Sequence, residues 1–587
     1  TGATVTLDSA TDATLKFIAG DDVILHSDAT PRIVTTGAAH TVRITADNEG
    51  ALDADRGSIT QTGTDVTIAR TTGTVDLHAQ AFDGIGSPAT PLRTTVDTIT
   101  ASTTGTGPIS IVETDAVTLT DVNTADGTIH VTAGGQITAT DVDAGGAGDV
   151  TLMTSSGDVI LDSVSATGDA ITIISAAAIE EAGAGDDGVD LSAMDIRLVA
   201  SSGIGTTGTI EIDADNLAAL TVVGDIRLSD VDGLTITTID STVGLQIIDA
   251  AASDDIQLTA GGTLTVNSIV SNAGAGNIDL TGDTVAQNAD ISANSTGTID
   301  VTADDGSITM ADGTTTTSGT GAITYDATET VALSLLTSTS GQLNVTADSD
   351  LDGSGSITDN TAGEAANLVT STTAVLSAAE GIGGTGDSDL DTTIATLQAT
   401  NSTSGDIIVH ETSGLTVGGT GVSNSGGHIK LTVSSGDLDI DADVTAHGNT
   451  VFLAVAGNMT QQMNDDITAD SLALMVDGTT RLDNAGNNVT NFAAMNGGQT
   501  VYRDADTLNI EEITVDGMTV TGIKTTNDDV KLIVDAGNLD IDESIALGSG
   551  NLFLDVAGNV TQQSADNITA AGLALMVDGT TRLDNAG

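Results

Sequence analysis

The sequence lacks most of the side chains that build an ordinary globular core. Among its 587 residues there is no cysteine and no tryptophan, and there are only 2 tyrosines, 5 phenylalanines and 4 prolines. The absence of cysteine excludes disulfide bonds and any metal or redox site built on thiolates. Aromatic side chains normally supply a large share of the buried apolar area. A chain this poor in them is therefore not expected to form several conventional domains.

Basic residues are also scarce. The chain has 14 lysine and arginine residues against 83 aspartate and glutamate residues, which gives a net charge of −69. Such a charge repels phosphate backbones and anionic membrane surfaces, so nucleic acid is not expected as a partner. No apolar run reaches the roughly 18 residues that a membrane-spanning helix needs, so no membrane span is expected. The acidity is compatible with a salt-adapted surface and with specific binding of divalent cations, and the sequence leaves both open.

Small and β-branched residues make up most of what is present. The hydrophobic fraction is 39%, supplied by valine, isoleucine, leucine and alanine, and 69 glycines accompany abundant threonine, aspartate, serine and asparagine. β-Branched side chains favour strands, whereas glycine, aspartate, asparagine and serine favour turns. The composition therefore predicts an all-β protein with many short strands and many turns.

A long internal repeat lies near the C-terminal end. Residues 448–486 recur as 549–587, an offset of 101 residues, and both copies end in LALMVDGTTRLDNAG. The match extends upstream, where 428–444 corresponds to 529–545. The second copy stops inside the repeat, and no basic-then-apolar leader opens the sequence. We therefore expect this sequence to be a processed or trimmed piece of a longer repeat protein.

A second, weaker module is marked by the tripeptide Gly-Ile-Gly. It occurs at 84–86, 203–205 and 381–383. After it come an apolar strand, a glycine turn and an alternating strand, which reads ISIVET at 109–114 and IIVHET at 407–412.

A shorter period of about 20 residues underlies both repeats. TIHVTAGGQITA (128–139) and DVTLMTSSGDVIL (149–161) each follow a glycine turn and alternate apolar with polar residues. Alternation with period two buries one face of a strand. Short runs bounded by glycine, aspartate, asparagine and serine are typical of strands.

Two architectures fit short strands at this spacing. An array of immunoglobulin-like sandwiches has domains of about 100 residues, but it relies on aromatic core anchors. A parallel β-helix, or β-solenoid, completes one turn in each short repeat and fills its interior with ladders of aliphatic side chains. We predict the β-solenoid, as one continuous structure over 1–587. Its predicted sub-modules are 1–126, 127–240, 241–427, 428–528 and 529–587.

The pattern of these turns resembles a known family. DIQLTAGGTLTV (255–266), like the two segments above, is similar to the repeats of filamentous-haemagglutinin-like exoproteins and giant bacterial repeat adhesins. The resemblance covers nearly the whole chain as a fold-level repeat and carries no site motif. It implies a right-handed parallel β-helix and a secreted bacterial protein with an extracellular, cell-surface or matrix role. The N-terminal secretion cap of such exoproteins is not recognisable here.

One segment has the spacing of a calcium loop. In DSDLDGSGSITD, starting at 348, acids stand at positions one, three, five and twelve, with glycine at the sixth. Oxygen ligands at alternate positions suit Ca²⁺, although Gly355 replaces the usual apolar eighth residue and no helices are expected to flank the loop. A solvated loop between turns is the alternative interpretation. The predicted calcium ligands are Asp348, Asp350, Asp352 and Asp359. Asp387, Asp389 and Asp391 form a partial echo of the pattern.

No catalytic constellation is recognisable. The seven histidines, His410 among them, are scattered over different turns, and no two have the spacing of metal ligands. The neighbouring acids Glu180–Glu181 and Glu511–Glu512 would point to opposite faces of a strand, which does not suit a two-carboxylate glycosidase.

We therefore predict a structural or adhesive protein that is not an enzyme. Its expected partners are identical chains, associated end to end or into fibres, and cell-surface or matrix glycans. Two alternatives stay open. One is a carbohydrate-active β-helix enzyme, which would need an acid, a base and aromatic side chains clustered on one face. The other is a cation-binding surface-layer protein.

Overall fold

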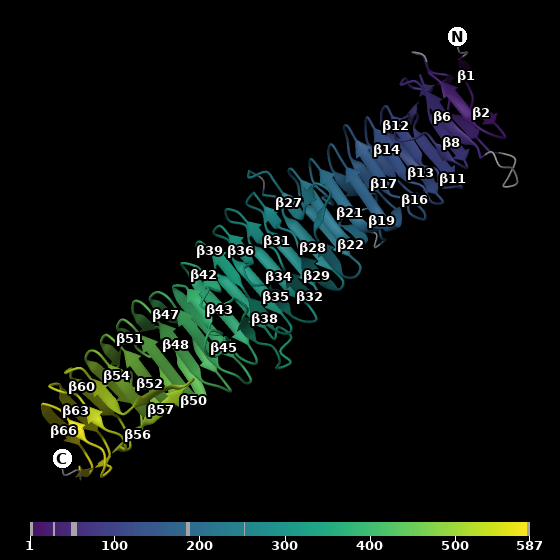
Figure 1. The fold of residues 1–587 in the computed structure, drawn as a ribbon. Helices are drawn as coiled ribbons and strands as arrows, with labels where there is room; N and C mark the ends of the chain where they lie inside the picture. The colour runs from purple at the N-terminus through teal and green to yellow at the C-terminus, as the bar shows by residue number, and fades with distance from the viewer. Residues whose placement is uncertain (1–3, 28–29, 48–55, 184–187, 252, 584–587) are drawn as a thin grey trace. The chain divides into compact units, whose positions relative to one another are not determined.

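The computed structural model describes residues 4–27, 30–47, 56–183, 188–251 and 253–583. Over these ranges the chain forms strands and turns and no helix, and its turns, about 24 with about 22 residues in each, are those of a parallel β-solenoid (Figure 1). The predicted all-β solenoid is confirmed, with an average turn slightly longer than the predicted 20 or so residues. The described part of the chain contains no helix long and apolar enough to cross a membrane.

The chain divides into two compact units. Unit 1 comprises Thr1–Asp283 with Ser292–Asn294, and unit 2 comprises Thr284–Ile291 with Ser295–Gly587. The last four residues of the second repeat copy, 584–587, lie outside the described ranges.

Aliphatic ladders fill the interior of unit 1. Three successive turns contribute the strands β12 (Ile109–Glu113), β14 (Ile129–Ala133) and β17 (Val150–Thr154), which lie side by side in Figure 1. They pair in parallel and in register, so that Ile111, Val131 and Leu152 stack one above the other and are fully buried. Because side chains alternate along a strand, the polar residues between them face outward. The period-two pattern in the sequence therefore corresponds to the inner and outer faces of the solenoid wall.

In unit 2 four short strands of the 101-residue repeat recur at the same offset. The first copy contains β48 (Ile429–Val433), β49 (Leu438–Ile440), β51 (Met459–Gln461) and β53 (Thr480–Leu482). Their counterparts are β60 (Val530–Val534), β61 (Leu539–Ile541), β64 (Val560–Gln562) and β67 (Thr581–Arg582). A hydrogen bond from the Thr460 hydroxyl to Asp439 recurs between Thr561 and Asp540. The repeat is thus conserved down to contacts between neighbouring turns.

Each Gly-Ile-Gly tripeptide stands where a turn makes only a short pairing with its neighbours. Its isoleucine is fully buried and bridges the strands before and after it, as Ile382 does between Ile357 and Ile407. The second glycine has a positive φ, for example +71° at Gly383. A Cβ at Gly383 would lie 2.2 Å from the carbonyl oxygen of Ile408. The tripeptide is therefore a structural motif, set by backbone conformation and close approach of the next turn.

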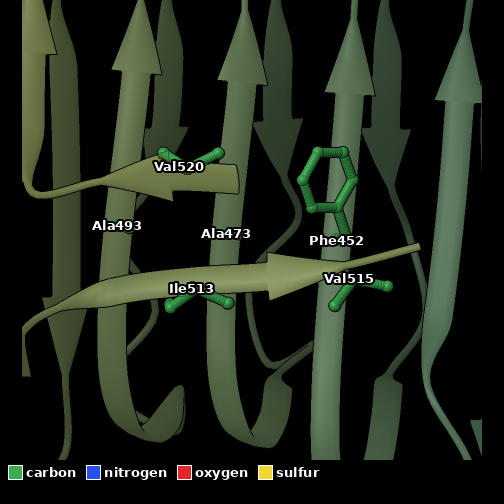
Figure 2. Packing of buried hydrophobic residues seen from close by; sticks show 6 residues of the cluster. All are labelled: Phe452, Ala473, Ala493, Ile513, Val515 and Val520. Atoms are coloured by element: carbon green, nitrogen blue, oxygen red, sulfur yellow. The ribbon is translucent and has the colours of Figure 1, made fainter. Parts of the chain in front are cut away.

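A β-hairpin interrupts the regular stacking in unit 2. Its antiparallel strands are β57 (Glu512–Val515) and β58 (Met518–Thr521). They cross the outer face of β50 (Val444–Val455), β52 (Ile467–Val476) and β54 (Asn488–Asn496), as Figure 2 shows. Ile513, Val515 and Val520 pack there on the outward-facing side chains Phe452, Ala473 and Ala493. The hairpin thereby buries an apolar stripe that would otherwise face water, a feature that the sequence analysis did not predict.

Two of the Gly-Ile-Gly modules share a buried glutamate. In unit 1, Glu113 accepts hydrogen bonds from the Thr94 hydroxyl (2.6 Å) and the Val96 amide (3.1 Å). In unit 2, Glu411 of β46 (Ile407–Glu411) accepts the same bonds from Thr392 (2.8 Å) and Ile394 (2.9 Å). These glutamates accept hydrogen bonds from buried hydroxyl and amide groups of the wall, and they are therefore part of the scaffold.

Glu113 gives unit 1 a defined pH dependence. Burial raises the pKa of its carboxyl from 4.5 to about 7, so the folded state binds the proton more tightly than the unfolded state. The stabilisation that follows is fully present below the pKa of Glu113 in the unfolded chain. It is lost as the pH rises through the pKa of Glu113 in the folded chain, and the free energy of unfolding then falls by about 3 kcal/mol.

We expect the free energy of unfolding to fall with rising pH more steeply in the wild type than in Glu113→Gln. Urea unfolding of both proteins, followed by circular dichroism between about pH 4.5 and about pH 8, measures the difference. Parallel pH profiles for the two proteins would contradict the assignment.

Candidate functional site

Charged side chains gather on the outer face of unit 2 where three successive turns meet. The strands involved are β44 (Leu390–Thr393), β46 and β48. Their parallel register places Asp391 beside His410, and His410 beside Thr432. Alternation along the strands directs these three side chains away from the aliphatic interior. Asp391 is nevertheless only 3% exposed, whereas His410 and Asp389 are half-buried and Glu364 is exposed.

Four of these side chains converge, and we call them the His410 cluster: Glu364, Asp389, Asp391 and His410. One ligand atom from each lies within 4.8 Å of all the others. His410 Nδ1 is 2.9 Å from Asp391 Oδ1 and 3.5 Å from Glu364 Oε2. On the other side of the ring, His410 Nε2 is hydrogen-bonded to the Ser434 hydroxyl. The imidazole is thereby held with Nδ1 toward the carboxylates.

The electrostatics of the cluster reflect crowded carboxylates. Burial, followed by the charge of Asp389, raises the pKa of Asp391 to about 6. Burial also raises the pKa of Asp389, against the opposing influence of His410 and Lys430. Lys430 forms an ion pair of 2.6 Å between its Nζ and Oδ2 of Asp516, in the turn of the hairpin. This ion pair connects the hairpin to β48. The positive charge of Lys430, which lies next to the cluster, is thereby paired with Asp516.

The structure brings together three of the four predicted calcium ligands. Carboxylate oxygens of Asp348, Asp350 and Asp352 lie within 4.8 Å of one another. Asp359, at the end of β41 (Ile357–Asp359), is not in this group, and its Oδ1 accepts hydrogen bonds of 2.7 Å from the Asn367 side chain and from the Thr361 amide. The loop can supply oxygen ligands from three residues, and calcium binding there stays a prediction.

The sequence predicts only part of the His410 cluster. Asp389 and Asp391 form an echo of the calcium pattern, and the spacing of the histidines gives no reason to connect His410 with them. The signal lay in their separation, since Asp391 and His410 are 19 residues apart, which is about one turn of the solenoid. Glu364 lies in the loop before β42 (Leu368–Val369), and no regular spacing in the sequence predicts that this loop places it beside His410.

Asp391, His410 and Ser434 also form a line that resembles an acid–base–nucleophile triad. A serine nucleophile needs amide donors for the oxyanion, commonly including its own N–H. The Ser434 amide instead donates to the carbonyl oxygen of Glu411 at 2.9 Å, as part of the stacking between turns. The Ser434 N–H is therefore not free to donate to an oxyanion.

The fold and its repeats define the chain as a β-solenoid repeat protein. No protein-family model matches it, and no curated protein or solved structure shows significant similarity to it.

Proposed function

We propose that the protein is a structural or adhesive extracellular protein of the filamentous-haemagglutinin-like kind, which forms a rod or filament on the cell surface or in the matrix. The observation that supports this proposal most is that the 101-residue repeat duplicates hydrogen bonds between neighbouring turns. Because the stability and the length of a solenoid grow with the number of stacked turns, a repeat of this kind extends the structure.

The polar turns illustrate this duplication. Asn458 Nδ2 donates to Asp437 Oδ1 (3.1 Å), and the Thr479 amide donates to Asn458 Oδ1 (3.0 Å). One repeat later, Asn559 donates to Asn538 (3.0 Å), and the Thr580 amide donates to Asn559 (2.8 Å). Acidic and amide side chains that look available for ligands in the sequence thus serve as hydrogen-bond partners of the next turn. Such a repeat extends a scaffold, which suits a structural role.

The proposed partners are identical chains and surface or matrix glycans. A net charge of −69 opposes association between identical chains, and salt screens this repulsion. We therefore expect electron microscopy of the purified chain to show separate particles at low ionic strength and end-to-end or lateral assemblies at higher ionic strength. Glycan binding can be measured on the same preparation with immobilised polysaccharides.

The competing function is a carbohydrate-active enzyme. Incubation of the purified chain with acidic and neutral polysaccharides distinguishes the two functions, because lyases and hydrolases release unsaturated or reducing ends. Polysaccharide cleavage, or a chain that stays dispersed at every ionic strength and binds no glycan, would contradict the proposal.

A further inference from the structure

We propose that the His410 cluster binds a divalent first-row transition metal, with the carboxylates of Glu364, Asp389 and Asp391 and Nδ1 of His410 as its ligands. The site is independent of the structural role proposed above.

The donor set selects the class of metal. An imidazole nitrogen together with carboxylate oxygens suits Zn²⁺, Mn²⁺ or Fe²⁺, whereas Ca²⁺ and Mg²⁺ are bound by oxygen ligands alone. The Asp348 loop, whose three side-chain ligands are all carboxylates, is therefore chemically distinct from the His410 cluster. Each of the two clusters provides a control for the other.

The three carboxylates of the cluster share one histidine. Asp391 is almost fully buried, and Oδ1 of Asp389 is buried with no hydrogen-bond partner among the described residues. Buried carboxylate oxygens are normally hydrogen-bonded or bound to a cation. Lys430, the neighbouring base, is already paired with Asp516. A divalent cation would satisfy the Asp389 oxygen and offset the repulsion between the carboxylates.

The histidine is oriented as a metal ligand is. Metal-binding histidines commonly form a hydrogen bond through the ring nitrogen that does not contact the metal, which fixes the tautomer and the ring plane. His410 forms such a bond between Nε2 and the Ser434 hydroxyl, which holds the ring plane, and because a hydroxyl can donate or accept, the bond suits the tautomer in which Nδ1 binds a metal. In the proposed site, Ser434 is a positioning residue that keeps Nδ1 directed at the carboxylates.

The equivalent module of unit 1 shows that the fold does not require these residues. There, Arg93 of β10 (Leu92–Thr95) pairs with Val112 of β12, in the same register in which Asp391 pairs with His410. Pro91 stands at the position of Asp389. The buried threonine and glutamate of the scaffold are shared by both modules, but the outward-facing acids and the histidine are not. Stacking therefore does not account for the His410 cluster.

The test is Zn²⁺ binding by the full chain. After treatment with EDTA and removal of the chelator, titration calorimetry and metal analysis of dialysed protein are expected to show one site that contains His410. Asp389→Asn and His410→Gln should each weaken this site at least about 100-fold, and Ser434→Ala about 10-fold, the range measured for partners that orient metal ligands. In the Co²⁺-loaded protein, the visible absorption of a nitrogen- and oxygen-bound ion should be lost in His410→Gln.

Two variants serve as matched controls. His130→Gln removes an outward-facing histidine on β14, whose parallel neighbours Ser110 and Thr151 are uncharged. Asp350→Asn changes the all-oxygen loop of the same unit. Neither should alter the Zn²⁺ site, and circular dichroism establishes that every variant is folded.

Equal Zn²⁺ binding by wild type and His410→Gln, or no binding by the wild type, would overturn the proposal. Hydrolysis of p-nitrophenyl acetate by the metal-free chain that disappears in Ser434→Ala would also overturn it and would assign the triad instead. None of these outcomes depends on whether the protein forms filaments.

Discussion

Replacing Gly383 by alanine is expected to destabilise unit 2 by about 2 to 4 kcal/mol. The backbone of Gly383 has φ +71°, and the added Cβ would lie 2.2 Å from the carbonyl oxygen of Ile408 and 3.0 Å from the Leu390 amide. Both atoms belong to strands of the solenoid wall. The methyl group can be accommodated only by separating neighbouring turns, and this separation would weaken the hydrogen bonds between them.

Gly386, in the same loop, provides the control. Its φ of +65° is similar, but no atom lies within 4 Å of a Cβ built there. Gly386→Ala should therefore cost only the conformational strain, about 1 kcal/mol. Urea unfolding followed by tyrosine emission reports on unit 2, because the chain has no tryptophan and both tyrosines, Tyr325 and Tyr502, are buried in that unit. Equal losses in the two variants would show that the close approach of the turns is not what constrains Gly383.

Truncating Phe492 to alanine is expected to cost unit 2 about 3 to 5 kcal/mol, the range for removing a buried aromatic ring. Phe492 is fully buried and stacks on Tyr502, with 4.4 Å between ring centroids and 5° between ring planes. Aliphatic ladders surround this aromatic pair, and the stacked turns cannot close easily over the cavity. The Tyr502 hydroxyl donates to Asp504 at 2.8 Å, so movement of the tyrosine would also disturb a buried hydrogen bond.

Phe553 is the matched control for Phe492. Its ring lies on the outer face of β63 (Asn551–Val556), is only partly buried, and is covered by Lys531 Nζ at 5.1 Å from the centroid. Phe553→Ala should cost about 1 kcal/mol, since only a partly exposed contact is lost. A similar loss of unfolding free energy in both variants would contradict the interior role of Phe492.

The regular part of the fold could be predicted because its causes are local. Alternation such as that of Ile129 and Val131 determines which face of a strand is buried, and glycine turns determine where each strand ends. The offset between the two repeat copies then fixes their equivalent strands. The hairpin could not be predicted in the same way. Ile513, Val515 and Val520 alternate like residues of any wall strand, and only the tertiary structure shows that they cover Phe452 from outside.

The candidate site was predictable only in fragments. Asp348, Asp350 and Asp352 are close in sequence, so their proximity follows from the loop itself, whereas Asp359 lies at the end of a wall strand and bonds to Asn367, a contact that no spacing predicts. The His410 cluster depends on the register between turns. A turn of constant length would have predicted the Asp391–His410 contact, but turns in this chain vary in length, so register cannot be counted from the sequence alone.

Inserted hairpins occur at equivalent places in the two units. In unit 1, Leu217 and Ala219 of β22 (Ile210–Thr221) pair with Ile236 and Leu245, and the hairpin of β25 (Thr238–Ile239) and β26 (Thr242–Val243) lies between these partners. In unit 2, Phe492 and Ala494 pair with Ile510 and Ile523, on either side of β57 and β58.

In both units the chain leaves the wall, makes an excursion and re-enters two positions further along the neighbouring strand. Residues inserted at this corner therefore leave the pairing of the interior side chains unchanged. Such corners admit added residues without a change of register in the interior, and in unit 2 the added hairpin has become part of the wall's outer surface through its contacts with Phe452 and Lys430.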